Sequence, residues 1–245
     1  MQIAFVAGAT GYTGREVVRL LAARGVRTVA HVRPDSARAD EWRRRFESEG
    51  AAVDTTPWVD AEITRTLSGL QPTHVFSLLG TTRARRRESA SHSSSKSRES
   101  SESSESYEAI DYGLTAMLIR AAVASGSQPR FVYLSALGVR EHVTNPYLLA
   151  RWRAESMLRA SGLPFTIARP SFITGPDRDE SRPLERMGAT IADAAAGVAR
   201  LFGAQRLAGS VRSITGPELA MGLVRQAFDA AAENATVGAD ELRAP

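Results

Sequence analysis

The stretch MQIAFVAGATGYTGR, residues 1–15, places a short apolar run directly before a turn that carries three glycines. Residues 2–7 favour extended backbone and predict a strand. After the turn, apolar side chains recur at helical spacing, so we expect a helix over residues 16–25. A strand, a glycine turn and a helix in this order form the unit with which a dinucleotide-binding fold begins.

The three glycines of this turn each permit something that a side chain would prevent. Gly8 lets the chain reverse after the strand, Gly11 lets the backbone approach a pyrophosphate, and Gly14 lets the helix pack closely on the strand. The helix would direct its free N–H groups and the positive end of its dipole at the phosphates. The expected cofactor contacts in this turn are Gly8, Thr10, Gly11, Tyr12, Thr13 and Gly14.

The composition of the 245-residue chain excludes several kinds of site. The chain has no cysteine, which excludes disulfides, thiolate metal sites and cysteine nucleophiles, and its four histidines are too scattered to predict a metal site. No apolar run approaches the roughly 20 residues that span a bilayer. The first expected strand begins at residue 2, which leaves no room for a signal peptide. We therefore expect a soluble, cytoplasmic protein with no metal and no membrane partner.

The net charge of +4, from 31 basic and 27 acidic residues, is only a small excess. The basic run RARRR at 83–87 has no interleaved aromatic residues, which argues against nucleic acid as a partner. Every basic residue except Lys96 is an arginine. We expect a small-molecule substrate, and a homodimer or a protein partner stays open.

Strands and helices alternate along the chain. Further strands are expected at 27–32, 51–56, 73–79, 130–134 and 163–168. Further helices are expected from Asp35 or Ser36 to 49, over 107–125, from the cap Asn145 to the stop Gly162, over 184–202 and over 216–232. This order predicts an α/β fold: a Rossmann-like, doubly wound parallel sheet with helices on both faces. We expect a single domain over residues 1–245 with a small C-terminal extension on the substrate side.

One segment interrupts this alternation. Eleven of the eighteen residues at 89–106 are serine, and so little there is apolar that the segment cannot build a core. We interpret residues 84–106 as a low-complexity insertion near the nicotinamide end of the site. Four interpretations of this insertion stay open: a solvated loop, a lid, a phosphorylated switch, or a phosphate-binding arm with Arg85, Arg86 and Arg87.

The ends of the other strands should meet the same cofactor, because ligands bind at the carboxyl edge of such sheets. Arg33 follows the second strand, where an arginine accommodates the 2′-phosphate of NADP and an acid would bind the 2′-hydroxyl of NAD. We expect NADP (NADPH), and nearby Asp35 keeps NAD open as the alternative. The end of the fourth strand adds Leu79, Gly80 and Thr81.

Several segments resemble the atypical short-chain dehydrogenases, whose turn has the form GxxGxxG. The Tat-interacting-protein group and, more loosely, the NmrA-like NADP-binding proteins are similar in GATGYTGR at 8–15, LLGTTR at 78–83, the helix at 147–151 and ARPSFITGPDRDESRPLER at 168–186. The resemblance spans about residues 2–228 apart from the insertion. It implies NADPH binding in one Rossmann-like domain, with Asp54 beside the adenine and with Arg169 and Pro170 as further contacts.

The same resemblance implies a catalytic group. Ser135, Tyr147 and Arg151 occupy the places of the serine and the Tyr-x-x-x-Lys of these enzymes, the last two on one face of a helix. In these roles Tyr147 donates a proton to a carbonyl oxygen, Ser135 hydrogen-bonds that oxygen, and the basic residue strengthens the acid and holds the nicotinamide ribose. This chain departs from the pattern, because Arg151 presents a planar fork where lysine presents a compact ammonium. Glu155, one turn on, is expected to engage Arg151 in a surface pair.

These features leave three functions open. The first is an NADPH-dependent oxidoreductase that acts on a small carbonyl substrate. The second is an NADPH-binding redox-sensing or regulatory protein without turnover. The third is an epimerase or dehydratase of the sugar-nucleotide type, which would keep its nucleotide tightly bound.

Overall fold

The structure is a computed structural model that describes residues 1–80, 107–171, 173–174 and 213–244. Three features expected from the sequence lie outside the described residues: the insertion at 84–106, Thr81 and the helix at 184–202.

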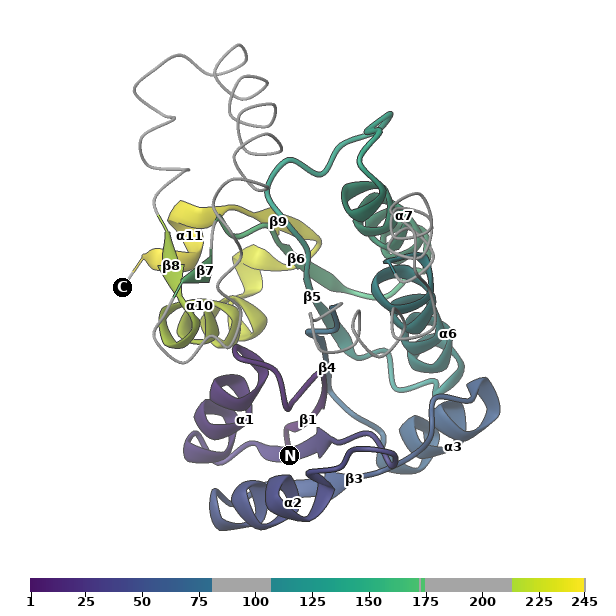
Figure 1. Cartoon of the computed structure of the whole chain (residues 1–245), viewed down its shortest axis with the longest axis vertical. Helices are drawn as coiled ribbons and strands as arrows, with labels where there is room; N and C mark the ends of the chain where they lie inside the picture. The colour runs from purple at the N-terminus through teal and green to yellow at the C-terminus, as the bar shows by residue number, and fades with distance from the viewer. Residues whose placement is uncertain (81–106, 172, 175–212, 245) are drawn as a thin grey trace, which may run out of the picture.

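A seven-stranded parallel sheet forms the centre of the protein, in the order β3-β2-β1-β4-β5-β6-β9 (Figure 1). Its strands are β1 (Ile3–Ala7), β2 (Arg27–His31), β3 (Ala52–Asp54), β4 (His74–Ser77), β5 (Arg130–Leu134), β6 (Phe165–Ala168) and β9 (Ala235–Val237). A second, two-stranded parallel sheet pairs β7 (Ile173–Thr174) with β8 (Ile214–Thr215). The doubly wound Rossmann-like fold expected from the sequence is confirmed.

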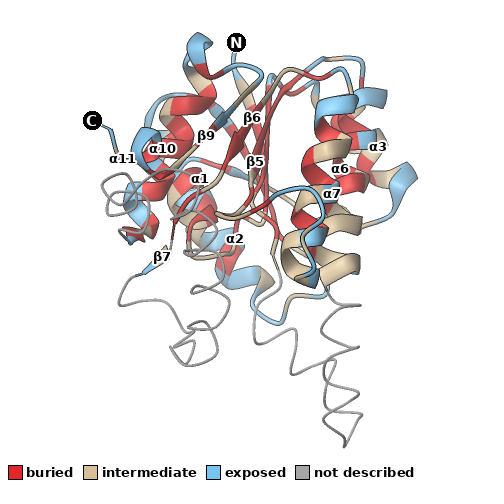
Figure 2. Cartoon of the chain, turned by 90° about the horizontal axis from the view of Figure 1, so that it is seen from above, coloured by how far each residue is buried: buried red, intermediate tan, exposed pale blue. Residues whose placement is uncertain are grey.

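Helices cover both faces of the sheet (Figure 2). On one face lie α1 (Gly14–Ala23), α2 (Ala39–Ser48), α10 (Gly216–Phe228) and α11 (Ala239–Arg243). On the other lie α3 (Asp60–Leu70), η1 (Tyr107–Leu114), α6 (Thr115–Ala124) and α7 (Pro146–Ala160). Strand β1 is buried from both sides: Phe5 packs in the α3–α6 cluster, while Ala4 and Val6 pack in the α1–α10 cluster. This double burial explains why the strands read as continuous apolar runs.

Local signals placed some helix ends correctly. Helix α7 begins at Pro146 after the cap Asn145, whose Oδ1 accepts a hydrogen bond from the Leu148 amide at 3.2 Å. Its end is followed by Gly162 with a φ of +78°. The cap and stop predicted for this helix are therefore confirmed.

The predicted start of the second helix at Asp35 or Ser36 is wrong. Residues 33–36 form a turn, in which the Ser36 amide donates to the Arg33 carbonyl at 3.1 Å and Asp35 pairs with the Arg33 guanidinium. The helix begins only at Ala39. Asp35 thus pairs with Arg33, and Ser36 closes the turn, so neither residue caps the helix.

Other elements differ from the predicted pattern. Helix α3, strand β9 and helix α11 were not predicted from the sequence. The helix expected at 107–125 begins with a π-helical segment, η1, before it continues as α6. The helix expected at 216–232 ends at Phe228 and is followed by the short 3₁₀ helix η2 (Ala230–Ala232).

The glycine turn after β1 is fixed by close backbone packing. Gly8 has a φ of +82°, and a Cβ on it would lie 2.6 Å from the Leu78 carbonyl oxygen. A Cβ on Gly14 would lie 2.1 Å from the Gly8 carbonyl oxygen. A Cβ on Gly11 would meet, among the described residues, only that same oxygen, at 3.2 Å. Gly8 and Gly14 are therefore required by the fold, and Gly11 lies on the open side of the turn.

At the opposite edge of the sheet, His74 is buried at the start of β4. Its ring lies 4.3 Å from the Phe228 ring, centroid to centroid, and its Nδ1 lies 3.0 Å from the Thr73 hydroxyl. Burial lowers the pKa of His74 to about 4, although a backbone hydrogen bond with Ala227 acts in the other direction. The fold therefore holds this imidazole in its neutral form at neutral pH.

We predict that Gly14→Ala destabilises the protein by at least about 2 kcal/mol, because the new methyl group meets a backbone carbonyl that cannot rotate away. Urea unfolding followed by circular dichroism measures the loss. Gly69→Ala is the matched control, because its Cβ in the exposed part of α3 would meet nothing within 4 Å. This control should stabilise by roughly 0.5–1 kcal/mol. Equal effects of the two substitutions would contradict the packing argument.

We also predict a loss of stability in acid that depends on His74. The unfolded chain binds a proton near pH 6.5 and the folded chain only near pH 4, so stability falls as pH drops through this window. Between pH 7 and pH 4.5 the loss due to His74 should be about 2 kcal/mol. Urea unfolding of His74→Gln should show a loss smaller by that amount. His142→Gln is the control. The His142 side chain is 90% exposed, so this variant should lose as much stability in acid as the unmodified protein.

Candidate functional site

The expected site residues gather at the carboxyl edge of the sheet, because all its strands run parallel. The glycine turn follows β1, Gly80 follows β4, Ser135 follows β5 and Arg169 follows β6. In Rossmann-like folds this edge is where ligands bind.

The turn and the start of α1 fit a diphosphate. Thr13 precedes the helix, and its side chain makes no capping hydrogen bond to the first turn. The Arg15 amide of that turn donates to the Gly11 carbonyl at 3.1 Å, so what the turn offers a ligand is mainly the positive end of the helix dipole. Gly11 adds the space through which such a ligand approaches the backbone. The residues present thus fit the phosphate bridge of a dinucleotide.

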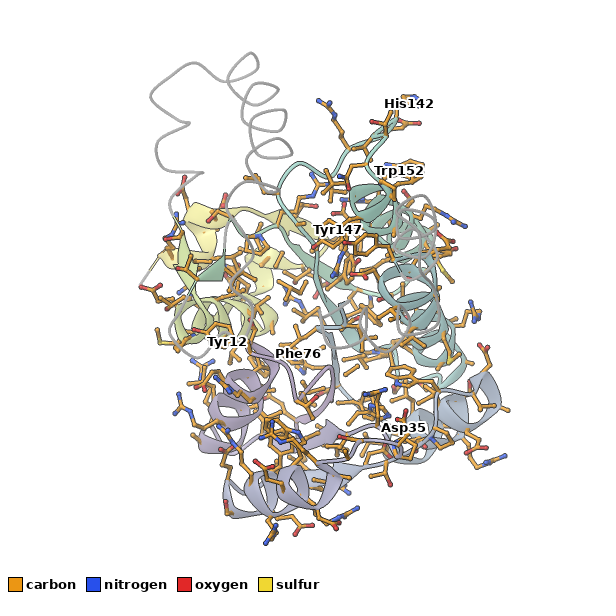
Figure 3. The ribbon with its side chains drawn as sticks, in the orientation of Figure 1. Tyr12, Asp35, Phe76, His142, Tyr147 and Trp152 are labelled. Carbon is orange, nitrogen blue, oxygen red and sulfur yellow. The ribbon has the colours of Figure 1, made fainter. Side chains whose placement is uncertain are left out.

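The side chain of Tyr12 is directed away from this cradle (Figure 3). Its hydroxyl donates to the Thr174 carbonyl of β7 at 3.3 Å. Its ring lies against Gly216 at the start of α10, where a Cβ would come within 2.4 Å of the ring. The Arg15 guanidinium lies 5.3 Å from the ring centroid. Only the backbone of Tyr12 is therefore placed to contact a nucleotide, as part of the turn.

The two residues expected at the adenosine end, Arg33 and Asp54, follow β2 and end β3. Arg33 is partly exposed, and its Nη1 donates to the Asp35 carboxylate at 3.2 Å. Asp54 accepts hydrogen bonds from the amide and the hydroxyl of Thr56, and the buried His31 ring lies 3.9 Å away. Burial lowers the pKa of His31, against the opposing effect of its bond to the Thr56 carbonyl. The side chains of Arg33 and Asp54 are thus held by internal hydrogen bonds.

Arg151 is buried and bonds to four acceptors within the protein. Its Nη1 donates to the Leu134 carbonyl at 2.6 Å and to the Tyr133 hydroxyl at 3.3 Å. Its Nη2 donates to the Leu79 carbonyl at 3.1 Å and to the Asp111 carboxylate at 2.6 Å. Guanidinium has five N–H bonds, and its Nε is buried with no hydrogen-bond partner among the described residues. Four of the five N–H bonds therefore serve the protein itself, and the fifth is buried inside it.

Gly80 provides the space for this ion pair. A Cβ at position 80 would lie 3.0 Å from Nη2 of Arg151 and 3.7 Å from the Asp111 carboxylate. Burial alone would lower the pKa of Arg151, but Tyr133, Tyr147 and Asp111 together hold it well above its usual value. The guanidinium is therefore a permanent cation, which cannot pass on a proton.

Tyr147 lies against this cation and is half-buried. The Cζ atom of Arg151 is 5.2 Å from the centroid of its ring. The ring of Tyr107, at the start of η1, meets it edge-on at 5.4 Å. Tyr133 is different, because it is fully buried and burial raises its pKa to about 12. Of these phenols, Tyr147 is the one that combines exposure with contact to the cation.

The carboxylate of Glu155 does not pair with Arg151, so that prediction is wrong. Glu155 is fully buried and accepts hydrogen bonds from the Ser135 hydroxyl at 2.6 Å, from Arg159 at 2.9 Å and from Arg169 at 2.6 and 2.9 Å. The Ser135 proton is therefore bonded to Glu155 inside the protein. Arg169 is held by the same carboxylate, and the adjoining Pro170 is buried. This part of the site ties β5, β6 and α7 together.

Three functional residues were missed or misjudged from the sequence: Asp111, Tyr133 and Glu155. Asp111 was the lone acid of the segment AIDYGL, and an acid amid apolar helix residues is a signal for a buried ion pair. Its partner could not be named, because Arg151 lies 40 residues away.

Within the described parts of the chain, no group of three His, Asp or Glu side chains could hold a metal ion. No helix there has the length and apolar character needed to cross a membrane.

Comparison with known proteins bears on the identity of this site. The sequence matches the NAD(P)H-binding family over residues 8–201. Protein fmp52-1, mitochondrial, of Aspergillus terreus is 30% identical over 193 residues, which cover 76% of this chain and 72% of that protein. These matches confirm an NAD(P)-binding protein, as expected from the turn and from the resemblance to the atypical short-chain dehydrogenases.

Solved structures show the same fold. A protein of Bacillus halodurans assigned as an NAD-dependent epimerase/dehydratase is similar with a TM-score of 0.65 at 18% identity, over 96% of this chain and 92% of that one. The enzyme WbmH of Bordetella bronchiseptica, in complex with NAD⁺, is similar with a TM-score of 0.60 at 17% identity, over 99% of this chain and 79% of that one. The chain therefore belongs to the NAD(P)H-binding family of Rossmann-like proteins.

Proposed function

We propose that the protein is an NADPH-dependent oxidoreductase that reduces a small carbonyl compound, with Tyr147 as the proton donor. One observation carries this proposal: the half-buried phenol of Tyr147 lies over the buried Arg151 cation, 5.2 Å from its Cζ. Both residues belong to α7, which packs at the same carboxyl edge as the Gly8–Gly14 turn. A phenol beside a fixed cation can give up its proton and bear the resulting charge.

The bound cofactor would supply hydride to the carbonyl carbon. In this proposal Tyr147 gives its proton to the carbonyl oxygen, and the Arg151 charge stabilises the phenolate that remains. Ser135 takes an anchoring role, because its proton is bonded to Glu155.

NADPH is the proposed coenzyme because of Arg33. Its guanidinium follows β2, where the adenosine ribose lies in this fold, and it is partly exposed. A 2′-phosphate would compete with Asp35 for this guanidinium and, carrying more charge, would bind it more strongly. NAD is the alternative, with Asp35 bound to the ribose hydroxyl.

A second candidate function is an NADPH-binding regulatory protein without turnover. It is favoured by the internal bonds of the expected catalytic group: four N–H bonds of Arg151 and the hydroxyl of Ser135 all serve the protein itself. The third function, an epimerase or dehydratase, is supported only by the names of proteins that have a similar fold. We further propose one domain over residues 1–245, located in the cytoplasm.

We predict that Arg33→Gln weakens NADPH binding about tenfold or more and changes NADH binding less than twofold, because only NADPH carries the 2′-phosphate. Isothermal titration calorimetry with each coenzyme measures both constants. Arg38→Gln is the matched control, since that arginine is held by two bonds to Glu41 at 2.6 and 2.7 Å. Equal weakening of both coenzymes by Arg33→Gln would remove the proposed role.

We predict that Tyr147→Phe lowers the rate of NADPH oxidation about 100-fold or more, with the affinity for NADPH unchanged, because it removes only the donated proton. The assay follows NADPH absorbance against a panel of aldehydes, ketones and quinones. Tyr107→Phe, on the neighbouring ring, should keep most of the rate. If the unmodified protein binds NADPH but oxidises it with no member of the panel, the regulatory function is favoured instead.

A further inference from the structure

The buried carboxylate of Glu155 holds two arginines but carries only one negative charge. Arg169 donates to it through Nε at 2.9 Å and through Nη2 at 2.6 Å, and Arg159 donates through Nη2 at 2.9 Å. The remaining donor, the Ser135 hydroxyl, is neutral. Within the described residues, the ion pairs of both arginines are with Glu155 alone. This group of side chains therefore has one positive charge in excess.

Part of the Arg169 guanidinium stays open. Its Nε and Nη2 form the edge that bonds to Glu155, so the two N–H bonds of Nη1 are turned away from that carboxylate. In the described part of the chain Nη1 has no hydrogen-bond acceptor, and it is not one of the buried nitrogens there that lack a partner. The side chain is 28% exposed. Solvent therefore reaches Nη1, whereas the partnerless Nε of Arg151 is buried.

The position of Arg169 in the sheet separates it from the phosphates of a coenzyme. Arg169 follows β6 and the glycine turn follows β1, with β4 and β5 between them. Because neighbouring strands lie about 4.8 Å apart, these two places are roughly 14 Å apart across the sheet. In this fold the two halves of a dinucleotide lie on either side of the switch between β1 and β4, the phosphates at the turn. Nicotinamide carries no negative charge, so the coenzyme offers Arg169 no anion.

We propose that Nη1 of Arg169 binds a carboxylate of the substrate, so that the carbonyl compounds reduced here are oxo acids. This inference rests on the proposed function, because it names the class of carbonyl compound. The single positive charge in excess matches the single charge of a carboxylate, whereas a phosphate monoester carries nearly two.

Glu155 acts in this proposal as a positioning residue. Its two bonds to Arg169 fix the plane of the guanidinium, and the Arg169 amide is fixed too, since it donates to the Val237 carbonyl of β9 at 2.8 Å. A guanidinium already held in one plane loses little freedom when it binds a second carboxylate.

The test compares aldehyde acids with their methyl esters, which keep the carbonyl group and lose the charge. The probes are para-formylbenzoate and succinate semialdehyde. Isothermal titration calorimetry measures their binding to the protein saturated with oxidised coenzyme, which has no hydride to give. At least one acid should bind about tenfold more tightly than its ester, as a charge-assisted hydrogen bond provides. The inference fails if neither acid binds more tightly than its ester.

Arg169→Gln removes the charge and Nη1. The affinity for the acid should fall about tenfold, and the affinities for the ester and for the coenzyme should each stay within about twofold. Equal weakening of acid and ester would contradict a contact with the carboxylate. A weaker coenzyme with an unchanged preference for the acid would place Arg169 at the nicotinamide instead, and would also overturn the inference.

Arg159→Gln is the matched control. Arg159 bonds to the same carboxylate, and its Nη2 also donates to the Thr236 hydroxyl of β9 at 3.0 Å. Its substitution removes the same charge from the group but leaves Nη1 of Arg169 in place. The preference for the acid should stay within about threefold of the parent value, because water screens the exposed arginine. A loss as large as in Arg169→Gln would show that only the net charge matters.

Arg169→Gln also takes two donors from a buried carboxylate, which can prevent folding. The double variant Glu155→Gln/Arg169→Gln removes both charges and is better tolerated, since a buried pair can often be replaced by neutral groups. It should lose the preference for the acid to the same extent. Persistence of that preference in the double variant would rule out the role of Arg169.

These binding measurements need no turnover, so they are independent of the proposed function. That function fails if the unmodified protein oxidises NADPH with no carbonyl compound, whatever the acids and esters show. The present inference fails separately if the protein reduces carbonyl compounds but handles each acid and its ester alike.

Discussion

The buried guanidinium of Arg151 joins four elements of the fold at the carboxyl edge of the sheet. Its own helix is α7, and its hydrogen bonds reach the second residue after β4, the end of β5 and the middle of η1. A cation withdrawn from water costs several kcal/mol unless every acceptor is in place. The position of each of these elements is therefore tied to the others, and Gly80 must stay without a side chain. The same bonds that assemble the edge also fix the surroundings of Tyr147.

The local part of the fold could be predicted from the sequence. Apolar runs marked six of the seven strands of the main sheet, and the Asn145–Pro146 cap marked the start of α7. These signals are local, because they lie within a few residues of the feature they specify. The start of α2 was misplaced because Asp35 pairs with Arg33 instead of capping the helix. Strand β9 was missed because its three residues carry little pattern of their own.

The site was predicted less completely, because its partners come from distant segments. The spacing of Tyr147 and Arg151 correctly placed the two side chains in contact. The predicted partner of Glu155 was wrong, because the residues that reach its carboxylate are set by the pairing of β5 with β6. There Leu134 lies opposite Ala168, so the next residues, Ser135 and Arg169, both reach the carboxylate of Glu155. Pairing between strands more than 30 residues apart leaves no periodic trace in a single sequence.

The contact of Tyr12 with Gly216 couples the start of the chain to its last fifth. The ring of Tyr12 occupies the space that a side chain at position 216 would need, and its hydroxyl is bonded to β7. Displacement of α10 would consequently be transmitted to the turn as a change in backbone shape. A substitution in α10, more than 200 positions downstream of the turn, can therefore weaken coenzyme binding. In a mutational scan, a loss of coenzyme affinity would not by itself show that the substituted residue contacts the coenzyme.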